Sequence, residues 1–178
     1  MRPENTARFA LLGLLLDQPH HGYDLYRDLA DPAGLGQVWH LGMSQMYAEL
    51  KTLEARDWVS ATMEQQGARP AKKIFALTPA GRAAFQEWMA TPSRGMRDMR
   101  VEFFVRLYFA QLKSAKAVTA LVERNEKSLR EELKKLQHAK PTSSDPNDFI
   151  QATHSFRISQ IQAAMTWLKT ARKLAVHH

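Results

Sequence analysis

The order of secondary-structure signals in the first ninety residues constrains this chain more than any other feature. Apolar residues spaced three or four apart predict helices, and these cover residues 6–16, 23–30, 42–58 and 79–89. Two β-prone runs, 58–63 and 72–77, lie between the last two of these helices, and the polar segment 64–71 separates them. The order therefore predicts three helices, a hairpin with a long tip, and a fourth helix.

The expected third helix has two faces of different character. Met46, Leu50 and Leu53 fall at i, i+4 and i+7, so they would form an inward face. Ser44 stands where an N-cap side chain is useful. The residues that face outward can hydrogen bond, and they are Ser44, Gln45, Tyr47, Lys51 and Thr52. This arrangement is typical of a winged helix-turn-helix, in which the third helix enters the major groove of DNA.

The hairpin and the residues after it are basic. No acidic residue occurs between Glu64 and Glu87, a stretch that contains Arg69, Lys72, Lys73 and Arg82. Cations at the tip and root of a wing would neutralise phosphates and hold the protein in register on DNA. An ordinary solvated loop is the alternative explanation of such a charge run.

The net charge of the chain is not the argument for DNA contact. The formal net charge is +7, but residues 1–92 hold nine Lys and Arg against ten Asp and Glu. Residues 93–178 hold sixteen against eight. The positive balance therefore comes from the second half, and the prediction of DNA contact in the first half rests on local placement of cations.

A change of pattern divides the chain. Residues 90–98 contain proline, serine and glycine and form the best candidate for a linker. We therefore expect a DNA-binding winged helix-turn-helix domain over residues 1–92 and a helical dimerisation and effector domain over residues 93–178. The expected fold class is mainly α, with one β-hairpin wing and a C-terminal long-helix dimerisation domain.

The second half is helical in pattern throughout. Its expected helices cover residues 100–112, 114–138 and 147–176. Leu129, Leu133 and Leu136 form a stripe that fits two arrangements. One is a coiled-coil-like contact in a dimer, and the other is an intramolecular hairpin with the last helix.

Composition and motifs argue against several other classes of protein. The chain has no cysteine, which excludes thiol catalysis and cysteine-ligated zinc. No apolar run approaches the roughly 20 residues that span a bilayer, and no signal peptide is recognisable, so we expect a cytoplasmic protein. His20, His21 and His40 match no metal-ligand spacing. Phosphate-loop, dinucleotide and hydrolase motifs are absent from the sequence, so we expect no cofactor and no enzyme. His177 and His178 receive no assignment.

Several segments of the first half resemble the PadR-type transcriptional regulators, in order and at matching spacings over residues 9–90. The segments are Leu11-Leu12-Gly13-Leu14-Leu15, His21-Gly22-Tyr23-Asp24-Leu25, Ser44-Gln45-Met46-Tyr47-Ala48-Glu49-Leu50-Lys51-Thr52-Leu53-Glu54, Gly67-Ala68-Arg69-Pro70-Ala71-Lys72-Lys73 and Leu77-Thr78-Pro79-Ala80-Gly81-Arg82. Residues 99–175 resemble the helical C-terminal domain of the virulence-activator-type branch of that family.

The resemblance implies a homodimer that packs through its C-terminal helices and binds a partly palindromic DNA operator. By position, the residues matching those that touch DNA in the family are Tyr23, Ser44, Gln45, Tyr47 and Lys51, and those matching its wing are Arg69, Lys72 and Lys73. Repression is the family default, although the virulence-type branch includes activators. Asp57 departs from the pattern, because the family usually has glycine at the end of the third helix. Aspartate takes the left-handed cap conformation less readily, so the resemblance leaves that cap open.

The resemblance also suggests an effector site. Some members of the family bind planar aromatic or cationic effectors near the dimer interface, and the candidate residues for a small aromatic effector here are Trp39, Trp88, Phe103 and Tyr108. Packing in the core is the alternative for each. A winged-helix adaptor that binds protein in place of DNA is the alternative function, and exposed apolar residues on the third helix would favour it.

Overall fold

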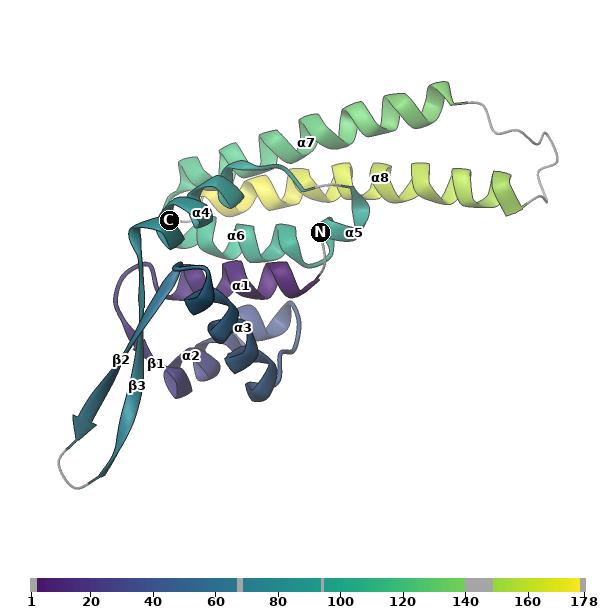
Figure 1. Cartoon of the computed structure of the whole chain (residues 1–178). Coiled ribbons are helices and arrows are strands. Elements are labelled where there is room, and N and C mark those ends of the chain that lie inside the picture. Colours follow the sequence, from purple (N-terminus) through teal and green to yellow (C-terminus); the bar gives the residue numbers. More distant parts are fainter. Residues whose placement is uncertain (1–2, 67–68, 94, 140–148, 177–178) are drawn as a thin grey trace. The chain divides into compact units, whose positions relative to one another are not determined.

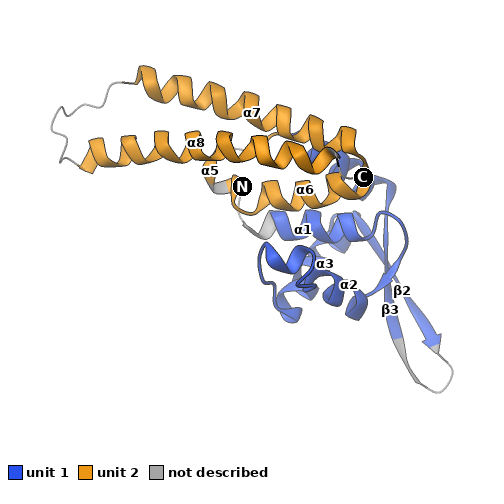
Figure 2. Cartoon of the chain, turned by 180° about the vertical axis from the view of Figure 1, so that it is seen from behind, with its two compact units in different colours: residues 1–91 blue, residues 92–178 orange. Residues whose placement is uncertain are grey.

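The computed structural model describes residues 3–66, 69–93, 95–139 and 149–176, without the side chains at 3–5, 66, 69–71, 97 and 176. It divides into two compact units, Met1–Thr91 and Pro92–His178, which Figure 2 shows in different colours. The fold is mainly helical with one small sheet, as the sequence predicts. Among the described residues, none of the helices combines the length and apolarity that crossing a bilayer requires.

Unit 1 is built around its first helix. Its elements, labelled in Figure 1, are α1 (Pro3–Leu14), β1 (His20–His21), α2 (Gly22–Leu29), η1 (Leu35–Gln37), α3 (Met43–Ala55), β2 (Val59–Gln66), β3 (Arg69–Leu77) and α4 (Pro79–Ala90). Helix α1 packs against α2, α3 and α4. Leu11 and Leu12 are fully buried, and the ring of Phe9 stacks on Trp88 of α4 with centroids 4.8 Å apart. The predicted order of helices and hairpin is confirmed.

The wing is longer than its sequence pattern predicts. β2 and β3 pair antiparallel from Val59 opposite Leu77 outward to Gln66 opposite Arg69, with an irregularity after Glu64. The ribbon thus runs through most of the polar segment that predicts a loop. The prediction of a loop is wrong because a β-ribbon that extends into solvent needs no apolar face beyond the core. A polar sequence therefore does not exclude a β-strand there.

A short strand that the sequence does not reveal completes the sheet. His20 and His21 form β1 and pair with Phe75 and Ile74 of β3, which gives the strand order β1-β3-β2. Two residues are too few to show the alternation by which strands are recognised. Because β1 leads directly into α2, it joins the start of that helix to the root of the wing.

The start of α3 is capped differently from the prediction. Gly42 is the N-cap, and the side chain of Gln45 accepts a hydrogen bond from the backbone N–H of Gly42 at 3.2 Å. The prediction of Ser44 as the N-cap is wrong, because the helix begins at Met43 and places Ser44 inside the first turn. Its hydroxyl is consequently available on the exposed surface of the helix.

The end of α3 turns on Asp57. This residue has φ 56°, in the left-handed region, despite being an aspartate. The N–H of Asp57 donates to the carbonyl of Glu54, and the N–H of Trp58 donates to the carbonyl of Leu53, both at 3.0 Å. These two bonds form a Schellman motif, the usual glycine-containing end of a helix. Asp57 thus adopts the cap geometry that the resemblance leaves open.

Unit 2 consists of helices. They are α5 (Met96–Met99), α6 (Glu102–Lys113), α7 (Ala115–His138), α8 (Phe149–Lys173) and η2 (Leu174–Val176). Helix α7 packs against both α6 and α8, and α7 and α8 run side by side in Figures 1 and 2. Leu129 and Leu136 of α7 are buried, as are Ile161 and Leu168 of α8. Of the two predicted arrangements of the leucine stripe, the structure shows the intramolecular hairpin.

A buried ionic network crosses unit 2. Arg106 on α6 is fully buried, forms an ion pair with Glu102 one turn earlier, and donates from Nη1 to Ser93 Oγ at 3.3 Å. The N–H of Ser93 donates to Asn125 Oδ1 on α7 at 3.1 Å. Burial holds the pKa of Arg106 below its ordinary value, although the carboxylates of Glu102 and Asp98 act in the opposite direction. The network ties the segment before α5 to α6 and α7, and nothing in the sequence pattern marks it.

Candidate nucleic-acid interface

Helix α3 separates buried from exposed residues as the sequence predicts. Met46, Leu50 and Leu53 are at most 1% exposed and face α1 and α2. The opposite side carries Ser44 and Lys51, both exposed. Small residues at Ala48 and Ala55 share this side at helical spacing and are exposed too. The outer surface of α3 therefore alternates polar side chains with alanines. The small alanine side chains leave room for the helix backbone to approach the floor of a DNA groove.

Tyr47 is held against the start of α2. A Cβ atom built on Gly22 would lie 2.4 Å from Tyr47 Oη and 2.9 Å from its Cε1 atom, so the ring occupies the space that a larger residue at position 22 would need. Tyr47 as a residue is nevertheless 42% exposed, so part of its side chain remains open to solvent. Tyr23, the next residue of α2, is 66% exposed. Two motifs far apart in the sequence thus form one contact.

Gln45 has a structural role that the sequence pattern does not assign. Its Oε1 atom already accepts the N–H of Gly42 at the helix start. A two-point contact with adenine uses both the oxygen and the nitrogen of a glutamine amide. Gln45 is an exposed residue, and it can make that contact by sharing its oxygen between two donors.

The two wing lysines lie in different environments. Lys73 Nζ is 2.9 Å from Glu54 Oε2 on α3 and lies 5.2 Å from the centre of the Phe75 ring. Lys72 is exposed on the other face of the ribbon, opposite Glu64. Glu64 in turn lies 3.4 Å from His21 Nε2. Lys73 is therefore partly neutralised by α3, whereas Lys72 projects into solvent.

The two arginines predicted to belong to the basic wing are Arg69 and Arg82. The side chain of Arg69 lies outside the described part of the structure. Arg82 is on α4, and its Nη2 atom donates to the backbone carbonyl of Leu16 at 2.7 Å. Arg82 thus lies on α4 and not on the hairpin, and its guanidinium hydrogen bonds to the chain after α1. Its interpretation as a phosphate-neutralising cation stays a prediction.

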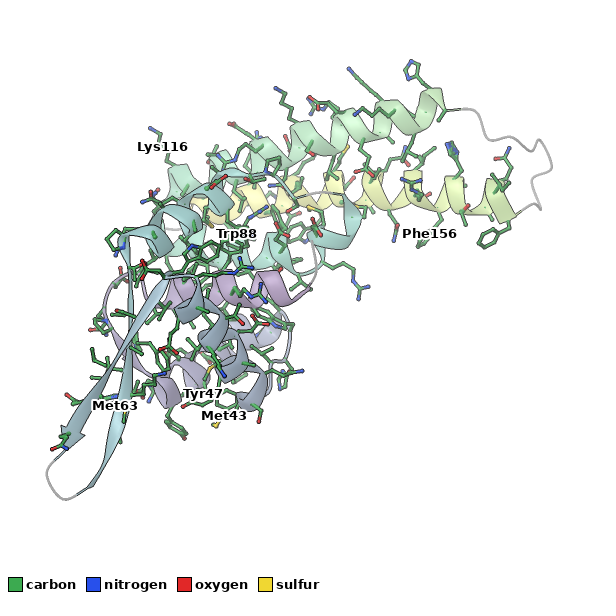
Figure 3. The ribbon with its side chains drawn as sticks, in the orientation of Figure 1. Met43, Tyr47, Met63, Trp88, Lys116 and Phe156 are labelled. Carbon is green, nitrogen blue, oxygen red and sulfur yellow. The ribbon has the colours of Figure 1, made fainter. Side chains whose placement is uncertain are left out.

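Two methionines that the sequence pattern does not mark are exposed on this surface. Met43, the first residue of α3, is 39% exposed, and Met63 on β2 is 64% exposed. Figure 3 labels both together with Tyr47, and all three point outward from unit 1. Helical spacing gives no signal for Met43, because it lies three residues before Met46 and seven before Leu50 and so shares their stripe. It is exposed as the first residue of the helix.

The predicted effector residues are distributed over both units. In unit 1, Trp39 is half-buried, and Trp88 is 3% exposed beneath Phe9. In unit 2, Phe103 is fully buried, with its ring edge-on to Trp167 at 5.9 Å, and Tyr108 is half-buried beside Phe109. An effector site formed by these residues stays a prediction. Among the described residues, no group of three or more His, Asp or Glu is arranged to hold a metal ion.

Two family models match the chain. The transcriptional regulator PadR-like family matches residues 11–87, and the virulence activator alpha C-terminal domain matches residues 99–175. The matched segments leave out only the first ten residues, the short stretch 88–98 and the last three residues.

Individual relatives are transcriptional regulators. The chain is 36% identical to the probable transcriptional regulator Rv1176c of Mycobacterium tuberculosis over 91 residues, which are 51% of this chain and 47% of that protein. It is 30% identical to the negative transcriptional regulator PadR of Bacillus subtilis over 102 residues, which are 57% of this chain and 55% of that protein. The chain spans about half the length of the curated relatives it matches.

Solved structures include similar chains. The crystal structure of Bacillus subtilis PadR in complex with operator DNA has a TM-score of 0.47 and 25% identity, with 93% of this chain and 97% of that chain covered. The structure of the same protein in complex with p-coumaric acid has a TM-score of 0.45 and 22% identity, with 100% and 99% covered. With one family model over each half, this chain belongs to the PadR-like family of transcriptional regulators over residues 11–87 and carries a virulence-activator-type C-terminal domain over residues 99–175.

Proposed function

We propose that this chain binds double-stranded operator DNA as a homodimer and represses transcription. Helix α3 of each protomer enters one major-groove half-site, and the wing contacts the flanking backbone. Half-sites then lie about one helical turn, or a multiple of it, apart. The observation that carries the proposal is the surface of α3, where Ser44, Tyr47 and Lys51 are exposed opposite a fully buried apolar stripe.

Contacts around α3 add support. The Lys73–Glu54 ion pair connects the wing to α3, and the Tyr47 ring connects α3 to the start of α2. Three elements that would meet the groove and its phosphates are thereby fixed relative to one another within unit 1. Such preorganisation lowers the conformational entropy lost on binding.

Repression and homodimerisation are the finer parts of the proposal. Repression is supported by the Bacillus subtilis relative, which is described as a negative transcriptional regulator. In transcription from the chain's own promoter in vitro, adding the protein should lower the yield of transcript, and Lys51→Ala should restore it. A rise in transcript on adding the protein would instead identify an activator. Two-fold symmetric footprints on that promoter would support a dimer on a palindromic operator.

Fluorescence anisotropy tests DNA binding most directly. The protein is titrated against its own promoter DNA and a scrambled duplex at two salt concentrations. We expect tight binding to the promoter, weaker binding to the scrambled duplex, and loss of affinity at the higher salt for both. Equal affinity for the two duplexes would refute an operator-specific regulator.

Exposed apolar side chains on α3 support a second candidate, a winged-helix adaptor that binds protein. Met43 and Tyr47 are 39% and 42% exposed, and such residues are enriched at protein interfaces. The same titration separates the candidates, because an adaptor binds neither duplex at either salt.

We further propose that a small aromatic effector releases the DNA. Its support is the aromatic cluster of unit 2, where Phe104 is 37% exposed and lies 5.0 Å from the ring of Trp167. Isothermal titration with p-coumaric acid and other phenolic or planar aromatic compounds is the test. Heat of binding accompanied by loss of promoter affinity is expected, and no heat from any of them counts against the effector.

A further inference from the structure

We propose that Met43 contacts the C5-methyl group of thymine in the operator and so determines part of its sequence specificity. This inference rests on the proposed function, because it assigns a role at the same DNA-binding surface. It goes beyond that function by naming the base that the residue recognises and the chemical group that it touches.

Met43 stands at the N-terminal end of the proposed recognition helix. It is the first residue of α3, and residues at the N-terminal end of a recognition helix contact base edges in helix-turn-helix proteins. The next two residues, Ser44 and Gln45, are exposed as well. Met43 therefore belongs to the part of α3 that reaches deepest into the groove.

Met43 is one of the few large apolar side chains of unit 1 that are exposed. Unit 1 buries most of its large apolar side chains. Among its described residues, the exposed large hydrophobics are Tyr23, Met43, Tyr47 and Met63. All four lie on α2, on α3 or on the wing, the elements proposed to meet DNA. Figure 3 shows Met43 pointing away from the domain with Tyr47 close by.

Chemistry selects the group that Met43 contacts. The thymine methyl is the one apolar group that base edges present in the major groove, where other positions are hydrogen-bond donors or acceptors. Methionine has no donor and only a weak acceptor, so it gains nothing from those polar positions. Its flexible thioether side chain can instead follow a methyl group. Ala48, exposed on the same outer surface, is small enough not to keep α3 from approaching.

Uracil substitution tests the contact without changing any hydrogen bond. Promoter duplexes are prepared with single thymines replaced by uracil across the footprint, and affinities are measured for the full-length protein and for Met43→Ala. Alanine is a good helix former at this exposed position, so the variant should keep its fold, and thermal unfolding checks this. Met63→Ala is the matched control, because it removes the other exposed methionine from the same surface.

The expected result is a loss of affinity of about fourfold at one or two thymines in each half-site, as burial of one methyl group provides. Met43→Ala should bind thymine DNA about fourfold more weakly and lose the difference between thymine and uracil at those positions. Met63→Ala should keep that difference, whatever its overall affinity.

Three outcomes would overturn the proposal. If the unmodified protein binds thymine and uracil duplexes equally at every position, no methyl group is recognised, and the proposed function still stands. If Met43→Ala keeps the full difference, another residue contacts the methyl. If the protein binds neither promoter nor scrambled DNA, the proposed function fails first, and this inference fails with it.

Discussion

At the scale of single residues, the contact between Tyr47 and Gly22 best shows how sequence becomes a site. Gly22 and Tyr47 lie in different sequence motifs, and neither motif indicates that the two residues are in contact. The tyrosine ring covers the backbone of Gly22 because no Cβ atom is there to exclude it. The position of the tyrosine ring is then set by the glycine as much as by α3.

Gly22→Ala should therefore weaken DNA binding without unfolding the protein. The added methyl would lie 2.4 Å from Tyr47 Oη, so the ring must swing away from its position. We expect promoter affinity to fall by roughly 10- to 150-fold, the effect of losing one hydrogen bond to a charged group. Anisotropy titration measures this, and the same substitution in a Tyr47→Ala background should have little further effect. Additive losses would show that the two residues act independently.

The wing lysines should differ in their contribution to salt dependence. Lys72 is exposed, whereas Lys73 already pairs with Glu54. The slope of log K against log salt is negative, and Lys72→Ala should make it less steep by about one unit, the effect of one lost phosphate contact. Lys73→Ala should change it by less than half as much. Titrations between about 50 and 200 mM salt measure both slopes, and equal slopes for the two variants would contradict this assignment.

At the scale of elements, the end of α3 determines where the wing begins. The Schellman end of α3 places Asp57 in the left-handed region, and the chain then enters β2. The carbonyl of Asp57 accepts the Thr78 hydroxyl at 2.6 Å, which joins this turn to the start of α4. The turn thus fixes both ends of the hairpin relative to α3.

Asp57→Gly should stabilise the protein by about 0.5–1 kcal/mol, because glycine adopts a positive φ without the steric penalty of a Cβ atom. The hydrogen bond from Thr78 goes to the backbone and remains. Urea denaturation measures the change. Arg56→Gly is the matched control, because Arg56 has φ −94° and glycine there should destabilise. A destabilised Asp57→Gly variant would mean that the aspartate side chain has a stabilising role.

Elements with strong periodic or capping signals could be predicted from sequence, and the remainder depended on contacts. The spacing of Met46, Leu50 and Leu53 predicts the inward face of α3. The pair Thr78-Pro79 is typical of a helix start, and Thr78 caps α4 by accepting the N–H of Gly81. β1 has only two residues and depends on its pairing with β3. The roles of Lys73 and Arg82 depended on partners distant in sequence, Glu54 and Leu16, which charge counting does not reveal.

At the scale of the whole molecule, charge and packing are divided between the two units. Residues 1–92 are slightly acidic in balance, and the basic excess lies in residues 93–178. Long-range attraction to a polyanion would therefore come mainly from the second unit, while the first supplies specific contacts. Unit 2 also contains the fully buried Arg106, whose ion pair and hydrogen bonds hold three segments together.

Arg106→Leu should destabilise unit 2 by roughly 3–5 kcal/mol, because it leaves the carboxylate of Glu102 buried without its partner. Replacing both Arg106 and Glu102 with leucine should recover much of the loss, since no charge then remains from the pair. Hydrogen exchange monitored by mass spectrometry reports each unit separately. Faster exchange confined to unit 2 in the single variant is expected, and unchanged exchange there would mean that the pair adds little to stability.

The contact between Gly22 and Tyr47 also limits how such proteins can diverge. A lineage that gains a side chain at position 22 must lose or move the aromatic ring at position 47, and with it the proposed contact to DNA. A lineage that has already replaced Tyr47 is free to change Gly22. We therefore expect the two positions, twenty-five residues apart in the sequence, to change together among related chains.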